Sequence, residues 1–319
     1  MLSRVADNLY WMSRYLERAE HTARLLDVTL DLMPDRAAET NHQAWQRLFD
    51  SLHAPPPEMP PINAFQFTQA LSFDTHNPGS ILHHITAARE NGRQVREQIS
   101  SEMWEQINRL YLDIKQSSIR QIWHQPHTFF QMVKQGIHLF QGISDSTMNH
   151  GEGWHFIQVG QFIERATNTA VLLNIYLQDA PPDHRVEPAS NSQYLDWVGL
   201  LRACTAFEAY CKVYTAETRF DCIAEFLLLN QAFPHSVHYA INKVRDALYT
   251  IAEATDKRKN NQVNRRAGRL EAMLDFDQIE EVLAGGLPEY LYRIEEECAR
   301  IHDAIYQTYI NYPASEKLT

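Results

Sequence analysis

"YLERAEHTARLLDV", at residues 15–28, is matched further along the chain by "FIERATNTAVLLNI", at residues 162–175. Both copies keep Glu-Arg-Ala, and apolar or small residues recur at every third or fourth position, as on one face of a helix. Two alanines on each of these faces leave room for another helix to come close. We therefore expect the two stretches to be related helices that make the same tight contact twice, packed about an approximate internal two-fold.

The Glu-Arg pairs themselves are Glu17 with Arg18 and Glu164 with Arg165. Adjacent helical residues do not face each other, so a glutamate cannot pair squarely with the arginine that follows it. A solvated surface does not require the same pair beside the same alanines in both copies, so we predict that both pairs are at least partly buried. Buried charges need a charged, hydrogen-bonded partner. The predicted arrangement is crossed: Arg18 reaches Glu164, and Arg165 reaches Glu17.

Two interpretations of this ion-pair site remain open at the level of sequence. In one, the four side chains form a structural latch that fixes the register of the two helices. In the other, they border a polar cavity in which the arginines bind an anionic or peptide-like ligand. The residue pattern does not decide between these two roles.

The rest of the chain also has helical patterns, so the predicted fold class is all-α, a helical bundle. The predicted helices are residues 3–33, 41–53, 81–114, 126–148, 152–179, 194–214, 219–230, 234–254, 261–275 and 287–312, with Asn77 as the cap before the third. Proline-rich stretches at 54–61 and 180–190 indicate connectors. We expect one large domain over residues 1–319, with a possible sub-division into 1–179 and 191–319.

A second candidate site is a basic stripe on the predicted helix 81–114. Arg89, Arg93 and Arg96 occur at i, i+4 and i+7, with glutamates one residue further round. Such a stripe can bind phosphate or carboxylate, because guanidinium groups grip planar anions with two hydrogen bonds. A solvated face with ion pairs along the helix explains the same pattern. Glu208, one turn from Cys211 and Lys212, is a further polar candidate, but the spacing does not indicate a nucleophile.

Composition excludes several classes of function. The chain has 29 Lys and Arg against 40 Asp and Glu, a net charge of −11, which argues against nucleic-acid binding. Neither the four cysteines nor the single Glu152-x-x-His155 motif supplies a metal-ligand set. Nucleotide-loop and nucleophile motifs are missing from the sequence. With no apolar run of membrane length and no secretory leader, we expect no metal, no cofactor, no membrane and a cytoplasmic location.

The longer motifs point to a family. They are "NLYWMSRYLERAEHTARLLDV" (8–28), "GSILHHITAARENGRQVREQISSEMWEQINRLY" (79–111), "EGWHFIQVGQFIERATNTAVLL" (152–173), "FEAYCKVY" (207–214) and "AEFLLLNQAFPHS" (224–236). Together they make the chain similar to the alpha-E domain family, bacterial helical proteins named for a Glu-Arg motif. The resemblance covers nearly the whole length.

The resemblance implies a cytoplasmic helical protein encoded beside, or fused to, a circularly permuted ATP-grasp ligase in a peptide or amide ligation system. On this basis the expected function is that of a non-ATPase partner, which binds or positions a peptide or carboxylate substrate through Arg18, Arg165 and the basic stripe. The alternative is an enzyme that uses Glu17 and Glu164 as acid and base. Compared with the family pattern, the first copy, with Arg14 and Glu20, is the more complete binding copy.

Overall fold

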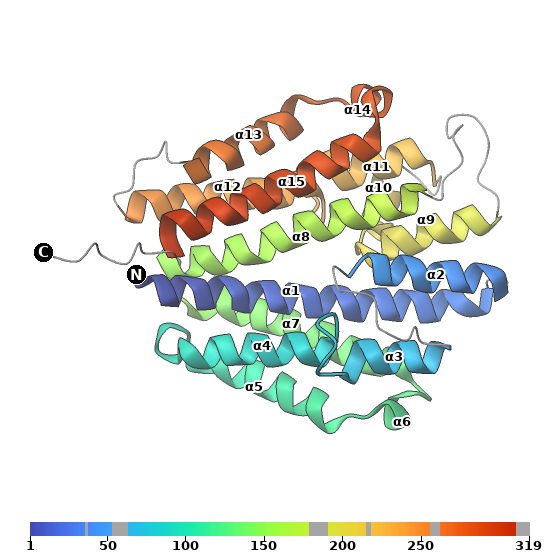
Figure 1. The fold of residues 1–319 in the computed structure, drawn as a ribbon, viewed down its shortest axis with the longest axis horizontal. Coiled ribbons are helices and arrows are strands. Elements are labelled where there is room, and N and C mark those ends of the chain that lie inside the picture. Colours follow the sequence, from blue (N-terminus) through green and yellow to red (C-terminus); the bar gives the residue numbers. More distant parts are fainter. Residues whose placement is uncertain (36–37, 53–62, 179–190, 215–217, 256–261, 311–319) are drawn as a thin grey trace, which may run out of the picture.

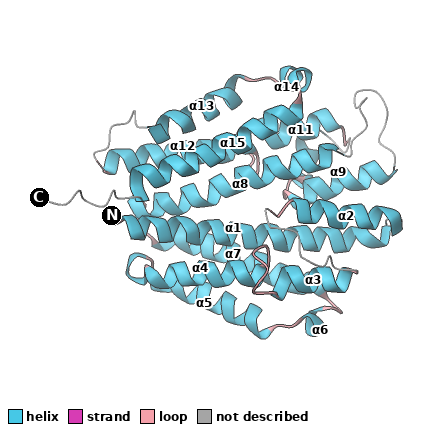
Figure 2. Ribbon diagram, viewed as in Figure 1, coloured by secondary structure: helices cyan, strands magenta, loops and turns pink. Residues whose placement is uncertain are grey.

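The computed structural model describes residues 1–35, 38–52, 63–178, 191–214, 218–255 and 262–310, and every regular element in these ranges is helical (Figure 2). The all-α prediction is therefore confirmed. Proline-rich stretches 54–61 and 180–190 lie outside the described residues. None of the described helices is both long enough and apolar enough to cross a bilayer.

The two Glu-Arg helices, α1 (Ser3–Leu32) and α8 (Glu152–Gln178), lie side by side in the middle of the molecule (Figure 1). They run in the same direction, since the amino group of Met1 lies 2.9 Å from Glu152 at the start of α8. At their crossing the backbones almost touch: a Cβ atom on Gly160 would lie 2.3 Å from the carbonyl oxygen of Tyr10. Only glycine fits at such an approach.

Each central helix is the first helix of a four-helix group. In the first group α1 packs against α4 (Ile81–Gln94) and α7 (Pro126–Thr147), and both of these pack on α5 (Ser101–Gln116). The shorter helices α2 (Ala38–Asp50), α3 (Ala64–Phe73) and α6 (Ile119–Ile122) and the 3-10 turns η1 (Met33–Asp35) and η2 (Arg96–Gln98) complete this half.

The second group repeats these contacts. Here α8 packs against α12 (Val237–Ala254) and α15 (Leu287–Ile305), and both pack on α13 (Gln262–Phe276). The remaining elements are α9 (Asn191–Ala203), α10 (Phe207–Tyr214), α11 (Phe220–Leu229), α14 (Ile279–Gly285) and the short π-helix η3 (Tyr306–Ile310). Since α8 packs on helices beyond residues 180–190, contacts cross that predicted connector. One cluster of buried apolar side chains extends through both groups, and the division into domains stays a prediction.

The two groups also share a hydrogen-bonded detail. Ser80 caps α4 and Ser236 caps α12, each accepting a hydrogen bond from the backbone three residues later. The loop before each cap accepts a hydrogen bond from a threonine of the Glu-Arg motif: Thr22 donates to the carbonyl of Gly79, and Thr169 to that of His235. These matched contacts are those that related halves would make. The approximate internal two-fold stays a prediction.

Two predicted helices are interrupted, and the prediction of each as continuous is wrong. The helix 81–114 ends at Gln94 and restarts at Ser101, where Ser100 caps α5. Periodicity could not detect this break, because Val95, Ile99 and Met103 keep a spacing of four and are all buried. Similarly, 194–214 is divided between α9 and α10, and Ser80 rather than Asn77 caps α4.

Candidate functional site

The four side chains of the Glu-Arg motifs meet between α1 and α8 in the crossed arrangement predicted from the sequence. Arg18 Nε lies 2.6 Å from Glu164 Oε1. Arg165 Nε lies 2.6 Å from Glu17 Oε1, and its Nη2 lies 2.9 Å from Glu17 Oε2. Glu17, Glu164 and Arg165 are buried, whereas the side chain of Arg18 is 29% exposed. The predicted burial is thus confirmed, with Arg18 at the edge.

Glu164 is shared by two arginines, because Arg14 Nε also lies 2.6 Å from its Oε2. Arg14 Nη1 in turn contacts the hydroxyl of Tyr10 at 3.2 Å and Nδ1 of His302 at 3.1 Å. We call Tyr10, Arg14, Arg18, Glu164 and His302 the Glu164 cluster. It joins α1, α8 and the end of α15, which lies far along the chain.

The protonation states of this cluster follow from its contacts. An arginine can only donate, so Nδ1 of His302 must accept from Arg14, and the Tyr10 hydroxyl, 2.8 Å away, donates to the same nitrogen. Burial, assisted by Arg14, lowers the pKa of His302 to about 4, which keeps the ring neutral. Burial alone would raise the pKa of Glu164, but Arg14 and Arg18 hold it well below its usual range. At neutral pH Glu164 and its two arginines are therefore charged and His302 is neutral, and the cluster is closed except at the partly exposed Arg18.

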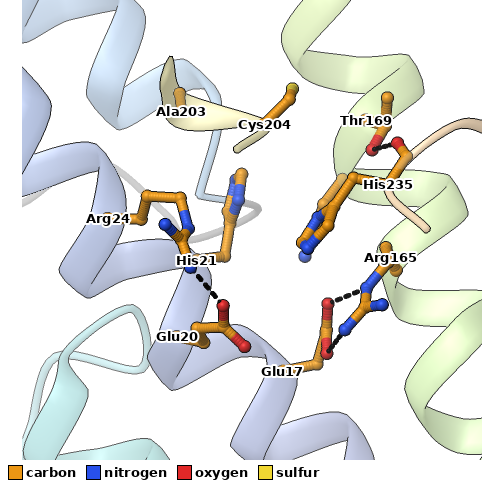
Figure 3. Close-up of a pocket in the computed structure, with 10 residues that line it drawn as sticks. Glu17, Glu20, His21, Arg24, Arg165, Thr169, Ala203, Cys204 and His235 are labelled. Atoms are coloured by element: carbon orange, nitrogen blue, oxygen red, sulfur yellow. Dashed lines mark hydrogen bonds and ion pairs between the residues drawn. The ribbon is translucent and has the colours of Figure 1, made fainter. Parts of the chain in front are cut away.

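The other pair borders a narrow cavity, which we call the Glu17 cavity (Figure 3). The empty space is about 310 Å³ when the open solvent at its mouth is included, but the centre of a water molecule can move within only about 20 Å³ of it. Its lining residues come from α1, α8, the end of α9 with the turn after it, and the loop before α12: Glu17, Glu20, His21, Arg24, Arg165, Asn168, Thr169, Ala203, Cys204 and His235. The cavity thus lies where both groups of helices meet.

Glu20 is the unusual group in this cavity. One of its oxygens, Oε1, accepts hydrogen bonds from Arg24 and from His138 on α7. The residue is only 2% exposed, yet its other oxygen, Oε2, has no hydrogen-bond partner. Figure 3 shows this second oxygen on the side of Glu17. A buried carboxylate oxygen without a donor is unfavourable, which marks this wall of the cavity as incomplete.

Two further lining groups are uncharged. Burial, with Arg165 next in effect, holds the pKa of His235 well below its usual range, so this ring is neutral. Burial raises the pKa of the Cys204 thiol to about 12. Cys204 is therefore a thiol at neutral pH and lacks the thiolate that nucleophilic chemistry requires.

Comparison with known proteins identifies the family of this chain. The family model Alpha-E, described as a predicted alpha-helical domain with a conserved ER motif, matches residues 1–310. The chain belongs to the Alpha-E family. The residues of that motif, Glu and Arg, are those that cross between α1 and α8.

Curated relatives of this Alpha-E domain occur in mycobacteria. The chain is 22% identical to the uncharacterized protein Mb2597 of Mycobacterium bovis, and equally to the uncharacterized proteins MT2643 and Rv2567 of Mycobacterium tuberculosis. Each match covers 89% of this chain and 34% of the relative, so the chain spans about a third of the length of the relatives it matches. No solved structure matches the chain.

In this chain the basic stripe is divided between two elements. The prediction that Arg89, Arg93 and Arg96 share one helical face is therefore wrong. Arg89 and Arg93 lie on α4, but Arg96 lies in η2, because the helix ends between them. Arg93 is exposed and pairs with Glu90, as the solvated-face interpretation expects. Arg89 and Arg96 lie over the ring of Trp104 on α5, at 5.6 and 5.5 Å. The contacts of these three arginines are with Asn108, Glu90 and aromatic rings of α5, and none of the three lines the Glu17 cavity.

Glu208 lies exposed in the first turn of α10 and does not line the Glu17 cavity.

Sequence reasoning missed Arg24, Asn168, His235 and His302 as members of the site. Arg24 was detectable, since it follows Glu20 by one helical turn. His302 was not, because no local pattern connects α15 with Tyr10. Among the described residues, no three His, Cys, Asp or Glu side chains are grouped closely enough to hold a metal ion.

Proposed function

We propose that this Alpha-E domain is a non-ATPase helical partner of an ATP-grasp peptide or amide ligase, and that it binds and positions a peptide or carboxylate substrate in the cytoplasm. The observation that carries the proposal is the buried network of charges beside the Glu17 cavity. Its described members are the arginines Arg14, Arg18, Arg24 and Arg165 and the glutamates Glu17, Glu20 and Glu164. Four guanidinium groups face three carboxylates, so the network carries an excess positive charge.

Arg18 is the residue of this network best placed to meet a substrate carboxylate. It contacts Glu164 through Nε and Nη2, and its side chain is 29% exposed. Its guanidinium also lies 5.7 Å from the ring of Trp11 and 5.8 Å from that of Tyr15. A guanidinium is planar by resonance, and flat aromatic neighbours help to orient it, which suits it to hold a carboxylate from solvent.

The same geometry favours binding over catalysis. All four carboxylate oxygens of Glu17 and Glu164 accept hydrogen bonds from arginine. An acid or base needs an oxygen that can exchange a proton with a substrate, and a pKa near the working pH. Burial, opposed by Arg165, raises the pKa of Glu17, but both oxygens of Glu17 are engaged by Arg165. Arg14 and Arg18 hold the pKa of Glu164 far below this range, and Cys204 is a thiol. The acid/base alternative, with Glu17 and Glu164 as the reacting pair, therefore has less support.

The length of the relatives is compatible with such a partnership between two domains of one chain. The region that matches this domain is 34% of each mycobacterial relative, so most of each relative lies outside it. The remaining two thirds of each relative is long enough to contain a catalytic domain. We propose that this catalytic partner is the ligase and that the helical domain positions its substrate.

Ligase turnover tests the proposal. An ATP-grasp ligase of the same organism is assayed for ATP hydrolysis and amide formation, alone and with this protein, and the two are checked for co-purification. We expect a stable complex and faster amide formation, with Arg18→Ala raising the KM for the carboxylate substrate at least tenfold. Arg93→Ala, which alters an exposed ion pair, is the matched control and should leave KM unchanged. The proposal would be refuted if the two proteins formed no complex and the turnover of the ligase did not change.

A further inference from the structure

The Glu17 cavity has a hydrogen-bonding requirement that the protein does not satisfy by itself. Oε2 of Glu20 is buried without a donor, although Oε1 of the same carboxylate accepts from two side chains. A ligand that completes the site must therefore bring an N–H or O–H group to this oxygen. This excludes a ligand group that only accepts hydrogen bonds.

The charges around the cavity restrict the ligand further. Glu17 and Glu20 are balanced locally by Arg165 and Arg24. An anionic group would bring a negative charge against the unpaired oxygen of Glu20. A cationic group would add to the excess positive charge of the surrounding network, in a buried place where charge is poorly screened. A neutral group avoids both penalties.

The remaining lining groups supply the complementary contacts. Asn168 lies on α8 within the cavity wall, and its amide can donate to a carbonyl oxygen. His235, neutral and on the opposite loop, carries one N–H donor and one acceptor nitrogen. Each oxygen of Glu17 has a second lone-pair direction besides the one used by Arg165. Acceptors on α1 therefore face donors from α8 and the loop before α12.

We infer that the Glu17 cavity binds a neutral carboxamide, the terminal amide of a peptide or of an Asn or Gln side chain. Its N–H groups meet Glu20 and Glu17, and its carbonyl oxygen meets Asn168 or His235. This inference deepens the proposed function and rests on it for the larger molecule to which the amide belongs. Arg18, in the Glu164 cluster, holds the substrate carboxylate, and the Glu17 cavity holds the amide.

Acetamide, acetate and methylammonium test the inference as probes, because acetamide and acetate have the same shape but different charge and donors. Binding to the full chain is measured by saturation-transfer NMR titration. For a ligand of so few atoms we expect a Kd for acetamide on the order of 10 mM, with no competition from acetate or methylammonium at tenfold excess. Binding of acetate or methylammonium as tight as that of acetamide would overturn the inference, as would no binding of any probe, which would leave water as the occupant.

Variants place the binding in the cavity. Glu20→Gln removes the charge and presents an amide to the ligand, so we expect the Kd for acetamide to rise at least tenfold. Ala203→Val narrows the cavity without touching a charged residue, and should have the same effect if Glu20→Gln fails to fold. Glu90→Gln makes the identical change in an exposed ion pair and should not alter the Kd. Unchanged binding in a folded Glu20→Gln or Ala203→Val variant would overturn the inference.

The two proposals fail separately. If acetamide does not bind but the ligase is still accelerated, the carboxamide inference is wrong and the proposed function stands. If acetamide binds in the cavity but no ligase responds, the cavity is a carboxamide site and the ligase partnership is wrong.

Discussion

The Glu164 cluster and the Glu17 cavity contain the same motif in two different settings. In the cluster, Glu164 is held by Arg14 as well as Arg18, and Arg14 also contacts Tyr10 and His302. At Glu17, Arg165 is the one arginine among the described residues that pairs with the carboxylate, and a cavity lies beside it. The repeated residues thus fix a crossed pair of ion pairs. Their unequal neighbours decide which pair is closed and which adjoins an empty space.

The sequence differences responsible are few. Position 14 is arginine in the first copy, whereas the matching position 161 is glutamine, so only Glu164 gains a second arginine. Position 20 is glutamate and its match, position 167, is threonine, which bonds to its own helix instead. Glu20 therefore brings a second carboxylate to the Glu17 side alone. These two differences, at positions 14 and 20, give Glu164 a second arginine and bring a second carboxylate to the cavity beside Glu17.

The largest expected effect is the loss of Arg165. In Arg165→Ala, Glu17 keeps its burial but loses both of its guanidinium hydrogen bonds, which leaves a stranded buried charge. We expect the free energy of unfolding to fall by about 3–5 kcal/mol, measured by urea denaturation. Arg93→Ala, at the surface, is the control and should leave the midpoint unchanged. A loss no greater than that of the control would show that the Glu17 pair is dispensable for the fold.

A smaller effect is expected for Arg18→Ala, although Arg18 occupies the matching position in the motif. Glu164 keeps its contact with Arg14, and Arg18 is partly exposed. We expect a loss of roughly 1–2 kcal/mol, again from urea denaturation. The double variant Arg14→Ala/Arg18→Ala should lose more than the sum of the two single variants, because only then is Glu164 stranded. Equal losses for Arg18→Ala and Arg165→Ala would remove the distinction between the two sides.

The smallest effect is a pH dependence of stability, caused by buried histidines of which His302 belongs to the Glu164 cluster. The folded pKa of His302 is lowered to about 4 and that of buried His84 to about 3, against about 6.5 in an unfolded chain. As the pH falls below about 6.5, the unfolded chain binds protons that the folded chain does not, so stability decreases toward pH 4. His302→Asn, which keeps an acceptor for Tyr10, should reduce this decrease between pH 7 and 5 in urea midpoints. An identical slope in the variant would contradict the neutral His302.

The sequence by itself determined the fold class, the burial of the two Glu-Arg helices and the crossed pairing. The fold class and the burial follow from the periodicity of apolar residues within each helix. The crossed pairing follows from the repeat of the motif and from the requirement that buried charges be paired. It could not place the helix breaks near Val95 and Thr205, since the buried apolar spacing continues through the first, and the second depends on one residue with positive φ.

Only the tertiary structure decided where the site is open. His302 comes to Tyr10 from the last long helix, and His235 and Cys204 reach the Glu17 side from two separate turns. Contacts between such distant segments depend on the packing angles of whole helices, which local patterns do not encode. The unpaired oxygen of Glu20 could not be predicted for the same reason. The sequence indicates which residues of its own helix a side chain can contact, but whether a partner is missing depends on all of the helices packed around it.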